Sequence, residues 1–430
     1  MAITGWFVVL VALGVVPVVL TGSGWAIVGW LGVVAALTVL DVALTASPRS
    51  LTIRRELPGA IRLGESAPAR LTVVNDGRRT LRGLVRDAWQ PSAGATPTRR
   101  RLSLRPGRAA TLTVTLTPFR RGERRAGGVT VRTIGPLRLA GRQATHEVPG
   151  AVRVLPRFSS RKHLPSRLAR LRELDGRTSV MIRGQGTEFD SLREYVRGDD
   201  VRSIDWRATA RRDDLVVRTW RPERDRRVVV VVDTGRTSAA RIDDEPRLDT
   251  AFESALLLGA LASRAGDRVD VVLFDRRVRG RVQGATGPAL LSSMVETMAP
   301  VEPELVETDW AAVPALVRSV TSRRALVVLA TTVDSPGASR SLLAAIPQLT
   351  RQHLVVVASV TDPALDETVV RRGTRDEVYR AASAERARLD QGRVAAALRQ
   401  VGADVVTGAP ADLPPALADR YLALKAAGRL

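Results

Sequence analysis

The chain has 430 residues, which is more than one ordinary domain needs, and its apolar content is enough for two or three separate cores. Its formal net charge of +22 is carried almost wholly by arginine, since Lys162 and Lys425 are the only lysines. Cysteine is absent, which excludes disulfides, thiol catalysis and cysteine-ligated zinc. The three histidines, His146, His163 and His353, are too far apart in sequence to predict a histidine metal cluster.

The positive charge has two interpretations. An arginine-rich surface is typical of a protein that lies against anionic lipid, and also of a protein that binds nucleic acid. Basic residues interleaved with aromatic ones, as in single-strand binding platforms, are not found in this sequence. We therefore expect a membrane surface as a partner and no nucleic acid.

Two apolar stretches stand at the start of the chain, over residues 2–20 and from 25 to about 46. The second reaches this length if Asp41 lies near the membrane interface. Both are long enough to cross the core of a bilayer, so residues 1–47 are predicted to form two transmembrane helices. Pro17 is expected to kink the first of them.

The charges around these stretches predict an orientation. Arg49, Arg54 and Arg55 follow the second stretch directly, and positive residues favour the cytoplasmic side of a membrane. We therefore expect a two-pass protein of the cell (inner) membrane, with both termini and the soluble domains in the cytoplasm. A signal peptide is one alternative for the first stretch, although it lacks a basic start, and a buried hairpin of a soluble domain is another.

Residues 51–156 follow the period of β-strands. The segment 110–117 alternates between apolar residues and threonine, which is typical of a strand with one buried face. The segment 70–77 is a similar strand that ends in an Asn-Asp-Gly turn signal, and Gly135-Pro136 is a further break. Several short strands with such turns predict a small antiparallel β-sandwich, which would serve as a spacer or interaction module.

Residues 157–227 form a charged segment with the most distinctive pattern in the chain. Acids and arginines alternate there at short spacing, with single aromatic residues between them. The residues that define the pattern are Gly184, Gly186, Glu188, Phe189, Leu192, Arg193, Glu194, Tyr195, Gly198, Asp199, Arg202, Ile204, Asp205, Trp206, Ala210 and Arg211.

This spacing allows ion pairs, and exposed pairs contribute only ~0–1 kcal/mol each, so orientation and partner recognition are their more natural use. The expected pairs join Glu194 with Arg193, Arg197 or Arg202, and Asp205 with Arg211. Glu188 and Asp190 are an alternative pair of carboxylates for hydrolysis, and the Gly-Gln-Gly loop is an alternative phosphate contact. No base, nucleophile and oxyanion donor converge in the sequence, so no catalytic residue is assigned.

The same stretch resembles the signature of the domain of unknown function 58 family, through its Gly-x-Gly-x-Glu-Phe, Leu-Arg-Glu-Tyr, Gly-Asp, Ile-Asp-Trp and Ala-x-Ala-Arg blocks. The resemblance extends over the whole chain. It implies a domain similar to von Willebrand factor type A domains, and association with MoxR-type AAA+ ATPases. It implies no established biochemical activity.

Residues 228–430 alternate between apolar strands and helices, which predicts a doubly wound α/β domain, von Willebrand factor type A-like by the resemblance. The expected strands are 228–233, 269–274, 325–330 and 354–360, and the expected helices are 248–264, 290–298, 339–349, 381–401 and 415–427.

Asp233, at the end of the first of these strands, is the candidate metal ligand. The metal site of von Willebrand factor type A domains uses an Asp-x-Ser-x-Ser loop, a threonine and a further aspartate, and such oxygen ligands suit Mg²⁺. Asp233 and Thr237 fit the first loop, whereas Gly235 removes one hydroxyl; Thr286 and Asp334 are the candidates for the other two loops. The alternative is a plain turn in which Asp233 caps a helix.

Taken together, these patterns predict a membrane-anchored binding or adaptor protein rather than an enzyme. A MoxR-type AAA+ ATPase in protein assembly or maturation is the partner that the resemblance implies. The alternative is a metal-dependent hydrolase that uses Glu188, Asp190 or Asp205 together with a metal at Asp233.

Overall fold

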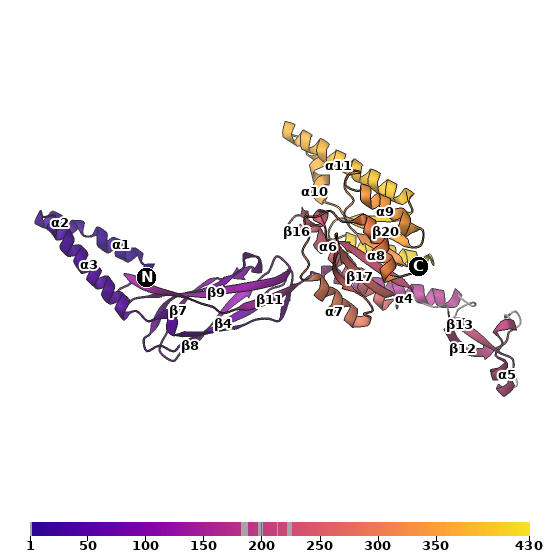
Figure 1. Cartoon of the computed structure of the whole chain (residues 1–430), viewed down its shortest axis with the longest axis horizontal. Coiled ribbons are helices and arrows are strands. Elements are labelled where there is room, and N and C mark those ends of the chain that lie inside the picture. Colours follow the sequence, from indigo (N-terminus) through magenta and orange to yellow (C-terminus); the bar gives the residue numbers. More distant parts are fainter. Residues whose placement is uncertain (1, 182–187, 197–198, 200, 213, 222–225) are drawn as a thin grey trace. The chain divides into compact units, whose positions relative to one another are not determined.

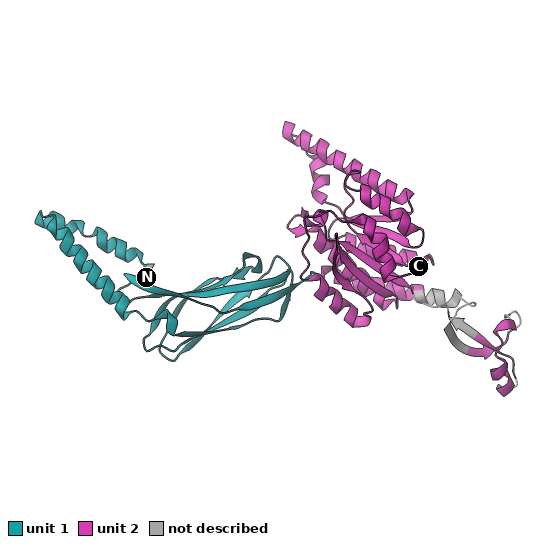
Figure 2. Cartoon of the chain, viewed as in Figure 1, with its two compact units in different colours: residues 1–157 teal, residues 158–430 magenta. Residues whose placement is uncertain are grey.

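The computed structural model describes the whole chain except residues 1, 182–187, 197–198, 200, 213 and 222–225 (Figure 1). The described residues form two compact units, 1–157 and 158–430 (Figure 2). Each unit has buried hydrophobic clusters of its own.

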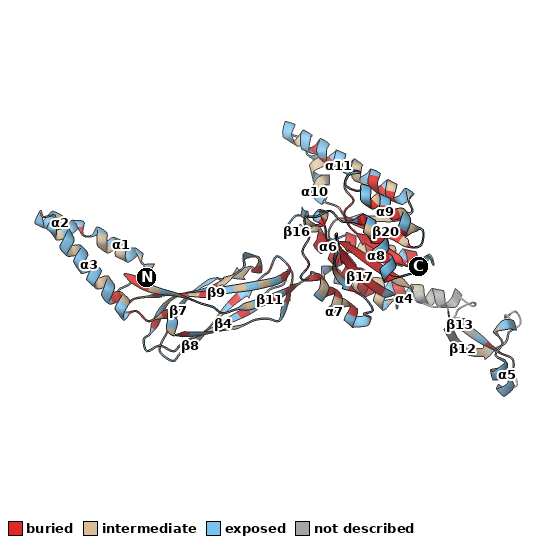
Figure 3. Cartoon of the chain, viewed as in Figure 1, coloured by how far each residue is buried: buried red, intermediate tan, exposed pale blue. Residues whose placement is uncertain are grey.

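The first unit opens with three apolar helices, α1 (Gly5–Ala12), α2 (Val15–Thr21) and α3 (Trp25–Leu44). Among the described helices, α3 is the one that is long and apolar enough to cross a membrane. Most of its side chains are exposed (Figure 3). The preceding segment, 5–21, is also apolar but shorter.

The first apolar stretch is broken between α1 and α2 at Leu13 and Gly14, one turn before Pro17. Proline lacks the amide that would bond to the carbonyl of Leu13, and its ring crowds that carbonyl. The two pieces pack along α3, where the Trp30 indole donates a hydrogen bond to the carbonyl of Leu10 at 2.9 Å. A Cβ on Gly14 would lie 2.7 Å from the Trp30 ring, so glycine permits this approach.

Two antiparallel sheets make up the rest of the first unit, with one parallel pairing between β3 and β11. One sheet contains β1 (Ala2–Ile3), β3 (Ala60–Arg62), β5 (Leu81–Trp89), β7 (Arg99–Leu104), β9 (Gly122–Ile134), β10 (Ala140–His146) and β11 (Gly150–Leu155); the other contains β2 (Leu51–Glu56), β4 (Ala67–Asn75), β6 (Ala95–Thr96) and β8 (Ala109–Leu116). Leu71 and Val73 of the second sheet share one buried cluster with Val85 and Val131 of the first.

The second unit is built on a six-stranded sheet in the order β18-β17-β14-β19-β20-β21. Its strands are β14 (Arg227–Asp233), β17 (Arg268–Phe274), β18 (Val278–Val282), β19 (Leu326–Ala330), β20 (Leu354–Val360) and β21 (Ala403–Gly408). All neighbours are parallel except β17 and β18, which are antiparallel. The five valines 228–232 of β14 are buried on both faces, as expected of a central parallel strand.

Helices cover both faces of this sheet (Figure 1). One face packs against α6 (Arg247–Arg264), α7 (Gly287–Met298) and α12 (Leu413–Ala426), and the other against α8 (Val313–Val320), α9 (Arg340–Thr350) and α11 (Arg375–Gln400). Two further helices are α4 (Leu164–Met181) and α10 (Pro363–Val370), and a short hairpin joins β15 (Arg241–Ile242) to β16 (Glu245–Pro246).

The charged segment contains a two-stranded β-hairpin after helix α4. Strand β12 (Glu188–Glu194) pairs antiparallel with β13 (Val216–Arg221), and helix α5 (Trp206–Arg212) lies in the connection between them. Ile204 forms an isolated bridge to Val217, which holds this connection against β13.

Candidate functional site

The carboxyl end of β14 lies where the chain path through the sheet diverges. After β14 the chain crosses to β17 on one side, whereas β19, on the other side of β14, leads on to β20. The loops that follow β14 and β19 therefore separate and leave a crevice, which is the place where open α/β sheets bind ligands. Asp233, the last residue of β14, stands at this point.

The Asp233 carboxylate is buried, with only 2% of the residue exposed. Its Oδ1 accepts hydrogen bonds from the Gly235 amide at 2.8 Å and from the Thr308 hydroxyl. Its Oδ2 accepts from the hydroxyls of Thr237 at 3.2 Å and Thr331 at 2.7 Å. These four donors offset the cost of removing a charged group from water.

The loop between α7 and α8 carries Thr308 to this carboxylate. It is held by a backbone hydrogen bond from the Glu304 amide to the Thr234 carbonyl at 2.8 Å. A Cβ on Gly235 would lie 2.4 Å from the Thr308 Oγ1, so a side chain at position 235 would displace the loop. The Thr308 hydroxyl thus occupies the space beside the Asp233 carboxylate that a side chain at position 235 would take.

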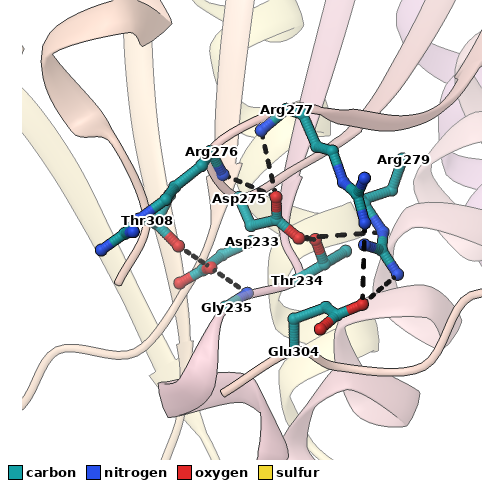
Figure 4. A network of polar contacts seen from close by, with 9 residues as sticks. All are labelled: Asp233, Thr234, Gly235, Asp275, Arg276, Arg277, Arg279, Glu304 and Thr308. Carbon is teal, nitrogen blue, oxygen red and sulfur yellow. Dashed lines mark hydrogen bonds and ion pairs between the residues drawn. The ribbon is translucent and has the colours of Figure 1, made fainter. Parts of the chain in front are cut away.

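Asp275, the residue after β17, is the centre of a second buried network beside Asp233 (Figure 4). Its Oδ1 accepts the amides of Arg276 at 2.6 Å and Arg277 at 3.0 Å. Its Oδ2 accepts the hydroxyl of Thr234 at 3.1 Å. Asp275 therefore fixes the residue that follows Asp233 as well as its own turn.

Arg279 extends this network to the loop that carries Thr308 (Figure 4). Its guanidinium lies 3.8 Å from Asp275 Oδ2 and 2.7 Å from Glu304 Oε1. The two adjacent strand ends and the Thr308 loop are thereby tied into one polar assembly, which holds the hydroxyls around Asp233 in place.

A small cleft opens beside the Asp233 carboxylate. Two ion pairs stand at it, between Arg236 and Glu307 at 2.5 Å and between Arg247 and Asp334 at 3.4 Å. Its lining consists of Asp233, Arg236, Thr237, Glu307, Thr308, Trp310, Thr331, Thr332, Asp334, Ala338, Ser339 and Leu342.

Three of the four metal ligands proposed from the sequence, Asp233, Thr237 and Asp334, line this cleft together. Thr286 does not join them. Strand β18 runs antiparallel to β17, so the chain beyond Val282 leaves at the amino ends of the parallel strands. Thr286 is exposed there, just before α7, at the edge of the sheet opposite Asp233.

Sequence reasoning missed Thr308, Thr331 and Asp275. Thr331 and Asp275 each follow a buried strand directly, and a search for polar residues at strand ends would have found both. Thr308 follows a loop with no periodic pattern, and its position depends on the backbone contacts of that loop.

The oxygen atoms at this site fit a hard cation such as Mg²⁺ only in part. The hydroxyls of Thr237, Thr308 and Thr331 donate to Asp233 and keep lone pairs free for a metal, and Asp334 adds a carboxylate at the same cleft. Within the described part of the chain, no three His, Cys, Asp or Glu side chains gather closely enough to hold a metal by themselves.

The signature hairpin uses its acids for its own structure. The Asp199 carboxylate accepts hydrogen bonds from both terminal nitrogens of Arg193, at 2.7 and 2.6 Å. Its Oδ2 also accepts a hydrogen bond from the Val196 amide at 2.9 Å. The expected pairing of Arg193 with Glu194 is therefore wrong, because the side chain of Arg193 reaches forward to the turn at Asp199. The hydrogen bonds that Arg193 donates to the Asp199 carboxylate raise the pKa of Arg193 above its ordinary value.

Asp205 caps helix α5. Its Oδ1 accepts the amides of Arg207 at 3.0 Å and Ala208 at 3.1 Å, and its Oδ2 forms an ion pair with Arg218 of β13 at 2.8 Å. The hydrogen bond from Arg218 and those from the backbone lower the pKa of Asp205 below its ordinary value. The partner is thus Arg218 and not Arg211, because β13 lies beside the helix start.

The remaining signature residues are distributed over this hairpin. Leu192 and Glu194 are on β12, Ala210 and Arg211 are on α5, and the Tyr195 amide bonds to the Leu215 carbonyl at 2.8 Å. Apolar side chains stand out on its surface: Val196 and Val201 are each 62% exposed and Trp206 is 66% exposed. Arg202 lies in the short turn 201–203, and Ile204 forms the bridge to Val217 of β13. Gly184, Gly186 and Gly198 lie outside the described residues, as do the side chains of Glu188, Phe189 and Asp190.

Comparison with solved structures adds no argument about fold or function. The matches include activated alpha-2-macroglobulin from Escherichia coli, at 12% identity and a TM-score of 0.21, over 24% of this chain and 7% of that one. The CARDB domain of the PF1109 protein from Pyrococcus furiosus matches at 20% identity and a TM-score of 0.19, over 24% of this chain and 91% of that one. Both TM-scores are too low to establish a shared fold.

Comparison with sequences is decisive for the family. An uncharacterized protein of Mycobacterium tuberculosis, Rv1480, is 30% identical over 249 residues, which is 56% of this chain and 77% of that protein. The uncharacterized protein Mb1516 of Mycobacterium bovis matches to the same extent. The model of the family described as "Protein of unknown function DUF58" matches residues 191–400, which include most of the signature hairpin and most of the α/β sheet. The chain therefore belongs to the DUF58 family of proteins of unknown function.

Proposed function

We propose that this chain is a membrane-anchored binding protein that works as an adaptor for an AAA+ ATPase of the MoxR type in the assembly or maturation of other proteins. In this proposal the N-terminal apolar segments cross the cell membrane twice. Both termini and the soluble domains are then in the cytoplasm, where such an ATPase is found.

The observation that carries the binding role is the way in which the carboxylates are used. Asp233 accepts four hydrogen bonds, and Asp199 and Asp205 each hold an arginine and backbone amides. A general acid or base needs a carboxylate that is free to exchange a proton with a substrate. Groups that are held in this way favour a rigid recognition surface over hydrolysis.

We further propose that the α/β domain is von Willebrand factor type A-like and that its cleft binds Mg²⁺. The hydroxyl oxygens of Thr237, Thr308 and Thr331 and the carboxylate of Asp334 would hold the cation, and Asp233 would orient the hydroxyls. A bound Mg²⁺ supplies a positive centre that takes an oxygen ligand from a partner protein. Calorimetric titration tests this: an Asp233→Ala chain that takes up Mg²⁺ as the parent does would reject the site.

The exposed apolar residues of the signature hairpin are the contact that we propose for the ATPase. Aromatic residues with an exposed apolar face are enriched at protein interfaces, and Trp206 is the largest exposed apolar side chain among the described side chains of this hairpin. Val196 and Val201 are further exposed apolar side chains of this hairpin.

Affinity purification of the full-length chain from native membranes in detergent, with ATP bound, tests the partner. We expect an AAA+ ATPase among the recovered proteins, and its loss in the Trp206→Ala chain. Phe119→Ala is the matched control, since this aromatic side chain is 57% exposed on the first unit. Recovery of no AAA+ ATPase, or equal loss in both variants, would contradict the proposal.

The hydrolase alternative makes a different prediction. A panel of phosphoester and peptide substrates would show turnover by the parent chain, and Asp233→Ala would abolish it whereas Phe119→Ala would not. We expect no turnover by the parent chain or by either variant.

A further inference from the structure

The carboxylate of Asp41 joins the end of α3 to the β-sheet of the first unit. Asp41 is fully buried, and its Oδ1 accepts the amide of Leu137 at 2.7 Å. Its Oδ2 accepts the amides of Leu139 at 2.9 Å and Ala140 at 3.0 Å. A buried anion with three backbone donors is costly to separate from them, so the turn between β9 and β10 is fixed against the last turn of the apolar helix.

Two other loops reach the same end of the unit. Arg79, after β4, donates a hydrogen bond to the carbonyl of Ala43 in the last turn of α3. The Asn75 side chain bonds to the carbonyls of Arg79 and Leu104, each at 3.0 Å. The amide of Gly107 returns a bond to the Asn75 carbonyl at 2.8 Å. The loops after β4 and β7 are therefore held together beside the helix end.

Six exposed arginines stand on these loops, on the turn between β9 and β10 and on the short segment 48–50 after α3, and we name them the helix-end arginine cluster. Its members are Arg49, Arg78, Arg79, Arg105, Arg108 and Arg138. Within the described part of the chain, none of the six forms an ion pair with a carboxylate. Asp76 is the acid in these loops, and it accepts the Thr52 hydroxyl instead. Charge concentrates in this unit as a whole, because residues 1–157 contain 23 arginines and 7 acidic residues, a net +16 out of the chain's +22.

We propose that the helix-end arginine cluster binds the phosphate groups of anionic phospholipids in the membrane that holds α3. This inference rests on the proposed membrane anchor and adds a lipid preference to it. A spanning helix that ends at Leu44, one turn beyond Asp41, places the cluster at the level of the headgroups. Arginine forms paired hydrogen bonds with phosphate oxygens, and each basic residue near an anionic surface contributes about 1 kcal/mol. Lipid is favoured over nucleic acid because the loops that carry the cluster are joined by hydrogen bonds to the end of the apolar helix.

The test uses the full-length chain in a neutral detergent, titrated with phosphatidylglycerol or with phosphatidylcholine, and native mass spectrometry to count bound lipids. We expect phosphatidylglycerol to bind at least about tenfold more tightly than phosphatidylcholine. The triple variant Arg79→Gln, Arg105→Gln, Arg138→Gln should lose that preference.

The matched control is Arg99→Gln, Arg100→Gln, Arg101→Gln, which removes the same charge from β7. These exposed arginines begin β7, whereas Leu104 ends it beside the cluster. At ~3.3 Å per residue, Arg99 and Leu104 lie ~17 Å apart along the strand. The control should keep the preference for phosphatidylglycerol. Equal loss in both triple variants, equal binding of the two lipids, or tighter binding of a short DNA duplex than of lipid would overturn the proposal.

Failure of this proposal is distinguishable from failure of the anchor. A chain that enters nanodiscs of either lipid but shows no preference between the lipids overturns the arginine cluster alone. A chain that stays soluble without detergent and enters neither kind of nanodisc overturns both.

Discussion

The hydroxyl of Thr331 donates a hydrogen bond to the carboxylate of Asp233 across 2.7 Å, although the two residues are 98 positions apart in the chain. They stand at the carboxyl ends of the neighbouring strands β19 and β14. This contact bridges the crevice where the sheet diverges, so it couples the geometry of the candidate site to the pairing of its two central strands. A change at Thr331 therefore affects both stability and ligand binding.

Thr331→Val should lower the free energy of unfolding by about 1–2 kcal/mol, because Asp233 loses one of four donors while it stays buried. The matched control is Thr332→Val. Thr332 lines the same cleft and makes no hydrogen bond to Asp233. Denaturant unfolding of the purified chain measures both, and equal losses in the two variants would show that the hydroxyl of Thr331 is not special.

Two variants test which threonine is a Mg²⁺ ligand: Thr308, which the structure places at Asp233, or Thr286, which was expected from the sequence. The Thr308 hydroxyl bonds to Asp233, whereas Thr286 is exposed at the opposite edge of the sheet. We expect Thr308→Val to weaken Mg²⁺ binding at least tenfold and Thr286→Val to leave it unchanged. Calorimetric titration of the full-length chain decides, and the reverse order would restore Thr286 as a ligand.

The difference between these two threonines shows where prediction from sequence stops. Buried strands such as β14 and β20 are continuous apolar runs, and the long helix α6 has an apolar face, so these three elements were predicted to within a residue. Helix α11, by contrast, begins at Arg375, six residues before the helix expected over 381–401. Asp233 was found because it ends such a run. Thr308 was missed because the loop before it has no period, and backbone hydrogen bonds to the Asp233 turn decide its course.

The ion pairs of the signature hairpin were missed for a related reason. Glu194 was expected to pair with Arg193, Arg197 or Arg202, and Asp205 with Arg211, six positions ahead. The structure pairs Arg193 with Asp199 and Asp205 with Arg218. Charge spacing alone does not reveal which strand lies beside which turn, and here the antiparallel pairing of β12 with β13 makes that choice.

Lys425 forms a buried ion pair that fastens the C-terminal helix α12 to the turn between α6 and β17. Its Nζ lies 3.0 Å from Asp267 Oδ1, with 6% and 2% of the two side chains exposed, and the Tyr421 hydroxyl donates to the other carboxylate oxygen. Lys425→Met should cost about 3–5 kcal/mol of unfolding free energy, since Asp267 would remain buried without its cation. Denaturant unfolding measures this loss.

The remaining lysine provides the control for this pair. Lys162 is exposed, so Lys162→Met should change the unfolding free energy by no more than about 0.5 kcal/mol. The double variant Asp267→Asn, Lys425→Met should be more stable than Lys425→Met alone, because it removes the uncompensated charge. A double variant less stable than the single one would mean that Asp267 does not depend on Lys425.

His353 should make the stability of the chain depend on pH. Burial lowers the pKa of His353 below its ordinary value of 6.5, and its Nδ1 is buried without a hydrogen-bond partner. The unfolded chain therefore binds a proton more readily than the folded one as pH falls from about 6.5 toward the lower folded pKa, and stability is lost over that window. Arg324, Arg351 and Arg429 line the same hollow and stay charged throughout it.

Two variants isolate this effect. His353→Phe removes the titrating group, so its unfolding free energy should fall less than that of the parent between pH 6.5 and the point where carboxylates begin to protonate. His163→Phe changes a ring that is only half-buried and should keep the slope of the parent. Urea unfolding at a series of pH values measures both slopes. The slope of unfolding free energy against pH depends on the difference in bound protons between the folded and unfolded chains. Equal slopes for the parent and His353→Phe would therefore show that the buried imidazole does not govern stability in this range.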